Sequence, residues 1–162
     1  QMDKKIFDRL TAYIVENQNR FYRLAYSYVR NREDALDAVQ SAVCRALEYG
    51  GGLQNGEAVK TWFYRILVNE CLRMIKERER FPEAREEEEI PYEEKSFEPA
   101  DDLDPLLSRL DQDTRTIIKL RFFEEMTIAE ISRITGLKLN TVKAKLYRGL
   151  KQLRITMKEA EL

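Results

Sequence analysis

A chain of 162 residues has room for one ordinary domain or two small ones, and its hydrophobic fraction of 43% is sufficient to build cores. The sequence has no histidine and only two cysteines, without a CxxC spacing, which argues against zinc and iron–sulfur sites and removes the commonest general base. No apolar run approaches the roughly 20 residues of a membrane span, and "QMDKKIFDRL" lacks the hydrophobic core of a signal peptide, so we expect a cytoplasmic protein.

The first predicted elements are two amphipathic helices. Apolar residues between Phe21 and Val29 recur at intervals of three and four, which is the spacing of one helix face. The segment "EDALDAVQSAVCRALE" predicts a second helix, with an apolar face of Ala35, Val39, Ala42, Val43, Ala46 and Leu47. Cys44 and Cys71 both lie among helical residues, and we expect them to be small core residues in a reducing compartment.

A glycine-rich break, "YGGGLQNG", follows the second helix. A long helix is predicted next, and its apolar residues are Val59, Trp62, Phe63, Ile66, Leu67, Leu72 and Ile75. No alternation of strand type appears in this half, so we expect an α-helical bundle over residues 1–80.

The next segment is strongly acidic. Residues 79–102 hold eleven acidic and three basic side chains, a net charge of −8, whereas the whole chain carries −1. The segment contains Pro82, Pro91 and Pro99 and has no apolar period, which predicts an extended, mobile linker over residues 81–102. A solvated spacer explains this composition, and a sharper interpretation is that its charge keeps it off phosphates or places it in a basic channel of a partner.

The second half, residues 103–162, predicts a helix-turn-helix. A short leucine-rich helix precedes "TRTIIKLRFFEE", which we expect to be capped by Asp113. Thr127 and Glu130 form the pattern of a capping box, and Gly136 stands where a left-handed residue closes a helix. Asn140 is the expected cap of the last helix. Two short helices joined by a glycine-containing turn of about four residues are typical of a helix-turn-helix.

The last helix is basic on its outer face. Residues 138–158 include seven Lys or Arg side chains and no Asp or Glu. Val142, Leu146, Leu150 and Leu153 share one face, so Lys143, Lys145 and Arg148 are expected to face away from it. A solvated helix usually mixes both signs of charge, whereas an acid-free face suits a polyanion. The pattern therefore favours DNA binding through the second helix of the motif, with Tyr147 packed at the edge.

The whole sequence resembles the extracytoplasmic function (ECF) sigma factors of bacterial RNA polymerase. The segments "FYRLAYSYVRNREDALDAVQSAVCRALE" and "TWFYRILVNECLRMIKER" are similar to conserved region 2, and the segment from "LSRLDQDTRT" to "LYRGLKQLR" is similar to region 4. "SYVRN", "RFFEE" and "NTVKAKLYR" resemble the sigma-V-like branch. The resemblance implies an all-α protein of two small helical domains and a promoter-specificity subunit that binds core polymerase and promoter DNA.

The resemblance also implies which residues bind. Asp34, Asp37 and Gln40 match the Asp-Ala-x-Asp-x-x-Gln motif that docks on the polymerase clamp, where carboxylates and an amide suit arginines. The family commonly has an acidic residue directly after this motif, whereas this sequence has Ser41 there. For the −35 element the candidates are Asn140, Thr141, Lys143, Lys145 and Arg148.

The glycine loop and the helix from Thr61 match the family's −10 reader, in which an unstacked base is held by loop and helix atoms. The candidates are Trp62, Tyr64, Asn69, Arg73 and Lys76, and Arg78 can also follow the DNA backbone. Asn69 can bond a base edge, and the aromatic rings can stack. Trp62 is equally well explained as a core residue.

Three other functions would make different demands on the sequence. A stand-alone helix-turn-helix regulator would need a dimerisation surface, and no such heptad is present. A nuclease would need clustered carboxylates, and the dense cluster Glu86–Glu89 lies in the predicted linker. A pure interaction module is the third. We therefore expect a protein without enzymatic activity, cofactor, metal or small-molecule substrate. The resemblance implies an anti-sigma partner, often membrane-anchored, and a role in envelope stress.

Overall fold

The computed structural model describes residues 4–53, 58–81 and 104–161. The chain divides into two compact units, Gln1–Pro99 and Ala100–Leu162. Every regular element in the described ranges is helical, as expected. The predicted linker lies outside the described residues from position 82 onward. None of the helices in the described ranges has the length and apolar character needed to cross a membrane.

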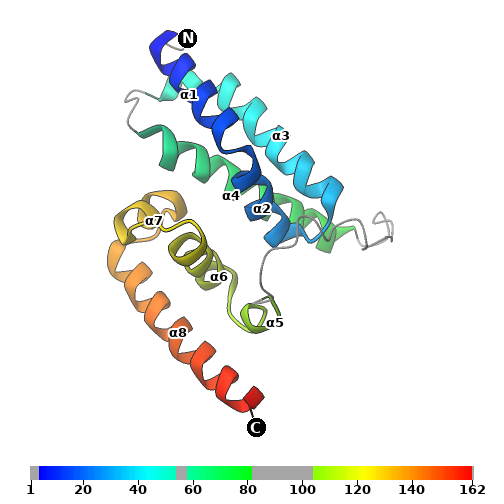
Figure 1. Cartoon of the computed structure of the whole chain (residues 1–162), viewed down its shortest axis with the longest axis vertical. Helices are drawn as coiled ribbons and strands as arrows, with labels where there is room; N and C mark the ends of the chain where they lie inside the picture. The colour runs from blue at the N-terminus through cyan, green and yellow to red at the C-terminus, as the bar shows by residue number, and fades with distance from the viewer. Residues whose placement is uncertain (1–3, 54–57, 82–103, 162) are drawn as a thin grey trace. The chain divides into compact units, whose positions relative to one another are not determined.

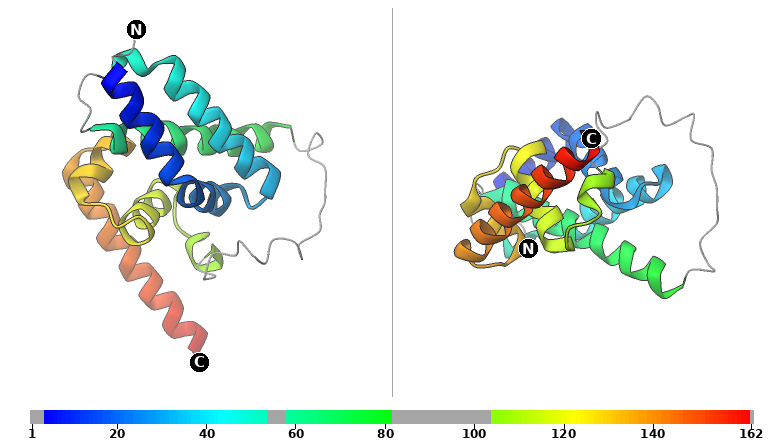
Figure 2. Two further views of the ribbon diagram at one scale, coloured as in Figure 1. Left: turned by 45° about the horizontal axis from the view of Figure 1, so that its top comes forward. Right: turned by 90° about the horizontal axis from the view of Figure 1, so that it is seen from below.

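In its described residues, the N-terminal unit contains the α-helices α1 (Lys4–Glu16), α2 (Gln18–Val29), α3 (Arg32–Glu48) and α4 (Val59–Arg80). A 3-10 turn, Gly50–Gly52, follows α3. The Asn31 side chain caps α3 by accepting a hydrogen bond from the Asp34 backbone N–H at 2.9 Å. Helices α2, α3 and α4 pack against one another, and α1 packs on α4 (Figures 1 and 2).

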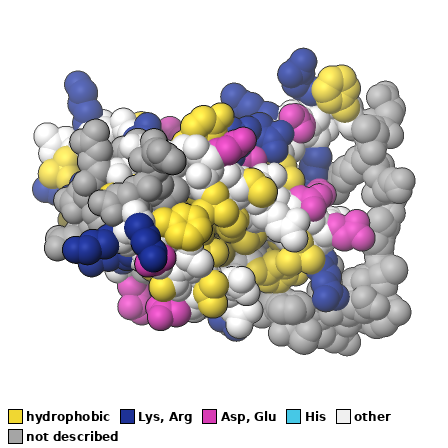
Figure 3. Space-filling view, turned by 90° about the horizontal axis from the view of Figure 1, so that it is seen from above, with side chains coloured by type: hydrophobic (Ala, Val, Ile, Leu, Met, Phe, Trp, Pro, Cys, Tyr) yellow, Lys and Arg dark blue, Asp and Glu magenta, His cyan; other side chains and the backbone are white. Residues whose placement is uncertain are grey.

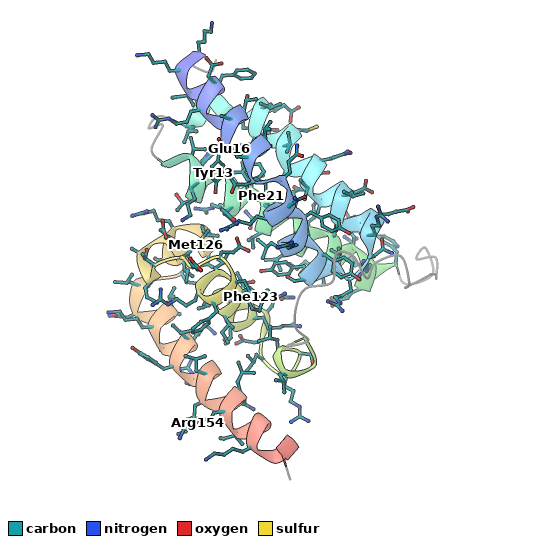
Figure 4. All side chains as sticks on the ribbon, in the orientation of Figure 1. Tyr13, Glu16, Phe21, Phe123, Met126 and Arg154 are labelled. Atoms are coloured by element: carbon teal, nitrogen blue, oxygen red, sulfur yellow. The ribbon has the colours of Figure 1, made fainter. Side chains whose placement is uncertain are left out.

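Aromatic rings fill the centre of this unit. Phe21 of α2 is fully buried and lies 4.7 Å from the Phe63 ring and 5.4 Å from the Tyr64 ring, between centroids. Tyr13 joins the cluster from α1, with its ring centroid 5.7 Å from that of Phe21 (Figure 4). Tilted and edge-on ring pairs of this kind contribute beyond the area that they bury, so they tie α1, α2 and α4 together.

The buried face of α3 differs from the predicted one. It consists of four fully buried alanines, Ala35, Ala38, Ala42 and Ala46. Val39 and Val43 are half-buried at its edge, and Leu47 is 42% exposed. Small side chains let α3 approach α2 and α4 closely, which turns the larger residues outward. Cys71 is buried as expected, whereas Cys44 is exposed, so the expectation of two core cysteines was wrong for Cys44.

The C-terminal unit contains α5 (Asp104–Leu107), α6 (Gln112–Ile118), a π-helical segment (Lys119–Phe123), α7 (Ile128–Thr135) and α8 (Leu139–Glu161). The capping box of Thr127 and Glu130 is confirmed, with both reciprocal hydrogen bonds present. Gly136 closes α7 in the left-handed conformation at φ 80°, which is also confirmed.

Two other predicted caps were wrong. The cap of α6 is Asp111, whose side chain accepts a hydrogen bond from the Thr114 backbone N–H at 2.8 Å, because the helix begins one residue before Asp113. Helix α8 begins at Leu139, so Asn140 lies inside its first turn. The Lys138 carbonyl accepts the bond from the Val142 N–H that opens this helix.

Close packing of α6 on α8 depends on Gly149. A Cβ atom at this position would lie 2.6 Å from Thr114 Cγ2 and 3.1 Å from Ile118 Cδ1. The Thr114 methyl belongs to a stiff, β-branched and buried side chain. The two helices would therefore have to separate.

We expect Gly149→Ala to destabilise the C-terminal unit by about 1–2 kcal/mol, because overpacking outweighs the gain in helix propensity. Urea unfolding followed by circular dichroism measures this change. Thr114→Ser removes the clashing methyl and keeps the hydroxyl, so the double variant should recover most of the loss. A double variant as unstable as Gly149→Ala would show that the clash with Thr114 is not the cause.

Candidate polymerase and nucleic-acid interfaces

The outer face of α3 presents the predicted polymerase-binding residues. Asp37 and Gln40 are both exposed and lie one helical turn apart. Cys44 continues the same line one turn further along. Leu36 and Leu47 flank it and are 44% and 42% exposed. Hydrophobic side chains reach the protein surface among charged ones (Figure 3). A surface with a carboxylate, an amide and exposed leucines can bind a partner that offers both cations and apolar contacts.

Asp34 is engaged within the protein. Its Oδ2 atom lies 2.6 Å from Arg78 Nη2, and the same nitrogen donates to the Val29 carbonyl at 2.8 Å. The Asp34 side chain is still 40% exposed. Arg78 therefore joins α4 to the start of α3, and its guanidinium is already engaged by Asp34 and the Val29 carbonyl.

A second set of candidates lies along one side of α4. At about 100° per residue, Trp62, Asn69 and Lys76 share this side. Asn69 and Lys76 are exposed, and Trp62 is half-buried. Arg65 is exposed on the same side and was not predicted. Its position three residues after Trp62 and four before Asn69 was the available signal. This side of α4 offers an amide, a ring edge and cations together.

Tyr64 does not belong to this surface. Two residues after Trp62, it lies about 200° around the helix, where it is 1% exposed and packs edge-on against Phe21. This burial argues against a direct contact between Tyr64 and a −10 base. In the sequence, a tyrosine at this position predicts a ring that stacks on a base. Only the packing of α2 on α4 shows that Tyr64 is a core residue.

Arg73 is exposed on α4 but is held by carboxylates. Its Nη2 lies 3.0 Å from Glu70 Oε1, and its Nη1 lies 2.8 Å from Glu77 Oε2. The buried Glu70 also forms an ion pair with Arg45 of α3, whose Nε atom lies 2.6 Å from Glu70 Oε2. The hydrogen bond to Glu70 raises the pKa of Arg73 above its ordinary value, against the opposing effect of burial. Neither Glu70 nor Arg45 was predicted, because their pairing joins side chains of two different helices.

The exposed face of α8 carries most of the predicted −35 residues. Asn140, Lys143 and Arg148 are exposed, and Thr141 is half-buried. Val142 and Leu146 are buried on the opposite face, as expected. Tyr147 is 69% exposed, so the expectation that it packs at the edge was wrong. Four residues after Lys143, it lies on the same exposed face, where its ring is free to contact a partner.

Lys145 does not face away with the other cations. Its Nζ lies 3.3 Å from Asp111 Oδ2, at the start of α6, and its side chain is 21% exposed. Two hydrogen bonds from Thr114, and then the Lys145 ammonium, lower the pKa of Asp111 below its ordinary value. Lys145 therefore joins α8 to the capped end of α6, and the expectation that it faces outward was wrong.

Two family models match the chain in separate ranges. Sigma-70 region 2 matches residues 13–81, and Sigma-70, region 4 matches residues 100–153. The RNA polymerase sigma factor SigV of Bacillus subtilis (strain 168) is 39% identical over 156 residues, which cover 94% of this chain and 93% of SigV. The chain belongs to the ECF sigma factors.

Other relatives of this sigma factor agree. The ECF RNA polymerase sigma factor SigM of Mycobacterium tuberculosis is 29% identical, covering 93% of this chain and 76% of SigM. The sigma factor RpoE, solved with the anti-sigma factor NepR from Bartonella quintana, has a TM-score of 0.73 at 21% identity, covering 91% of this chain and 96% of RpoE. CnrH, solved with the cytosolic domain of CnrY, has a TM-score of 0.63 at 18% identity and covers 93% of this chain and 88% of CnrH.

Two predictions are thereby confirmed. The sigma factor has the all-α fold of its family, with a region 2 bundle and a region 4 helix-turn-helix. Its family function is to direct RNA polymerase to promoters at transcription initiation. The comparisons support this function and not that of a stand-alone helix-turn-helix regulator.

Proposed function

We propose that the three surfaces described above divide the work of this sigma factor. The outer face of α3, with Asp37 and Gln40, binds core RNA polymerase. The α4 face around Asn69 captures a base of the −10 element, and the α8 face around Lys143 reads the −35 element. The observation that carries the proposal is that Asp37, Asn69 and Lys143 are all exposed, each on a different helix.

The roles of individual side chains follow from their surroundings. The α4 side chains available to DNA are Asn69, Trp62 and Lys76. Arg73 adds a guanidinium that its hydrogen bond to Glu70 holds in one orientation. On α8, Asn140, Thr141 and Arg148 complete the reading surface. Lys145 acts indirectly by holding α8 against α6. Asp34 helps to hold the polymerase-binding helix through Arg78.

The sigma factor works in the cytoplasm and catalyses no reaction itself, since promoter recognition requires binding and strand capture and not bond chemistry. An anti-sigma partner, membrane-anchored and released under envelope stress, would inhibit it by covering the α3 or α8 surface. RpoE, which shares the fold, was solved with the anti-sigma factor NepR, and CnrH with the cytosolic domain of CnrY. Region 2 and region 4 would both be accessible once that partner leaves.

Strand opening separates a sigma factor from a regulator that leaves duplex DNA closed. Asn69→Ala should leave polymerase binding and −35 binding intact. It should lower open-complex formation about tenfold, because roughly 1.4 kcal/mol of hydrogen bonding to the unstacked base is lost. Permanganate footprinting of unpaired thymines measures this directly. A template already melted over the −10 element should recover part of the loss, since the cost of opening is removed.

The matched control is Asn19→Ala, an exposed asparagine on α2. It removes the same side chain from a different helix and should open promoters like the wild-type protein. Normal opening by Asn69→Ala would contradict the assignment of this base contact. Equal loss in both variants would indicate a general effect of the substitution.

A further inference from the structure

Helix α8 carries a row of polar, mostly basic residues that is longer than the proposed reading surface. Asn140, Lys143, Tyr147, Lys151, Arg154 and Lys158 follow one another at intervals of three or four residues. At about 100° per residue they fall within an arc of about 80° on one side of the helix. From Asn140 to Lys158 the row extends about 27 Å at about 1.5 Å per residue. It is one continuous surface from the first turn of α8 to its last.

The last two residues of this row, Arg154 and Lys158, lie beyond the region 4 match. The region 4 family model ends at residue 153, and α8 continues beyond α6 and α7 (Figure 1). Lys151, Arg154 and Lys158 are exposed, and Arg154 projects from this part of α8 (Figure 4). Among the α8 residues whose side chains are described, the buried ones are Val142, Leu146 and Gly149, so these cations are not part of the buried core.

These cations form no ion pair with the side chains that the structure describes, whereas four other cations do. Arg45, Arg73 and Arg78 each contact a carboxylate, as does Lys145. Among the side chains that the structure describes, which leave out Glu159 and Glu161, no ion pair involves Lys151, Arg154 or Lys158. Like charges three and four residues apart destabilise a helix. An anionic partner along this side would offset that repulsion.

We propose that Lys151, Arg154 and Lys158 form a phosphate rail that binds the DNA backbone beside the −35 element. The inference rests on the proposed function of the α8 reading surface. A straight helix cannot follow the groove for about 27 Å, so its later turns leave the base edges and meet the sugar-phosphate backbone. Contacts to phosphates position a protein on DNA without reading its sequence. The rail therefore contributes affinity and salt dependence, while Lys143 and its neighbours contribute specificity.

The test uses the triple variant Lys151→Gln/Arg154→Gln/Lys158→Gln, reconstituted with core polymerase. Binding is measured from about 50 to about 200 mM salt on promoter DNA and on the same DNA with a scrambled −35 element. Each lost phosphate contact lowers the slope of log Kobs against log salt by about 0.9, so the slope should become shallower by roughly two to three. The ratio between the two DNAs should stay that of the wild-type protein.

Three further variants isolate the cause. Lys4→Gln/Lys5→Gln/Arg9→Gln on α1 changes net charge by the same amount and should keep the wild-type slope. Arg154→Lys should also keep it, because a phosphate contact needs charge and not the guanidinium shape. Lys143→Ala, at the reading end of the row, should reduce the preference for the intact −35 element.

The outcomes distinguish the rail from the proposed function. The rail alone is overturned if the triple variant keeps the wild-type salt slope. It is also overturned if the triple variant loses its preference for the intact −35 element to the same extent as it loses affinity for DNA. Tighter DNA binding by the triple variant also overturns it and would indicate that an acidic segment of the chain occupies the row. A wild-type holoenzyme without any −35 preference overturns the reading surface and the rail together.

Discussion

Asp37→Arg combined with Gln40→Ala is expected to abolish binding of core RNA polymerase. The proposed partner surface is rich in arginine, which prefers a carboxylate and an amide at hydrogen-bonding distance. The variant replaces attraction by repulsion between like charges, which costs several kcal/mol at an interface. Both residues are exposed on α3, so the bundle should fold normally. Pull-down of core enzyme measures binding, and circular dichroism measures helical content.

The matched control is Asp8→Arg/Gln18→Ala, which makes the same two changes at exposed positions of α1 and α2. This variant should bind polymerase like the wild-type protein. Retained binding by the α3 variant, with native helical content in both proteins, would contradict the assignment of the α3 face. Loss in both would indicate that net charge, and not position, determines the result.

Removing both arginine partners of Glu70 should destabilise the N-terminal unit by about 3 kcal/mol or more. Glu70 is only 4% exposed and forms ion pairs with both Arg45 and Arg73. Arg45→Ala/Arg73→Ala leaves its charge buried without compensation. Each single variant leaves one guanidinium in place and should cost about 1 kcal/mol, since both arginines are partly exposed. The double loss should therefore exceed the sum of the single losses.

Fluorescence of Trp62 in urea provides the measurement, because it is the one tryptophan of the chain and lies in α4. Adding Glu70→Leu to the double variant removes the unpaired charge and fills a similar volume, so stability should return. If the losses of the single variants simply add, or if Glu70→Leu does not restore stability, the effect is a loss of packing and not an unpaired charge.

Local signals in the sequence determined the elements and the family of this protein. Periodicity of three and four predicted the helices because each buries one face, and Thr127, Glu130 and Gly136 predicted the ends of α7 because caps use adjacent residues. The motif around Asp37 and the basic last helix indicated the ECF sigma factors, and the relatives confirm this.

Only the tertiary structure decided which side chains remain available to a partner. Tyr64 became a core residue through Phe21 of α2, and Lys145 was drawn to Asp111 of α6. Arg78 of α4 pairs with Asp34 of α3, and the buried Glu70 of α4 pairs with Arg45 of α3. The physical reason is common to all of them. Periodicity determines the side of a helix on which a residue lies, whereas the partner of a charge or ring lies on another helix, at a distance that only packing sets.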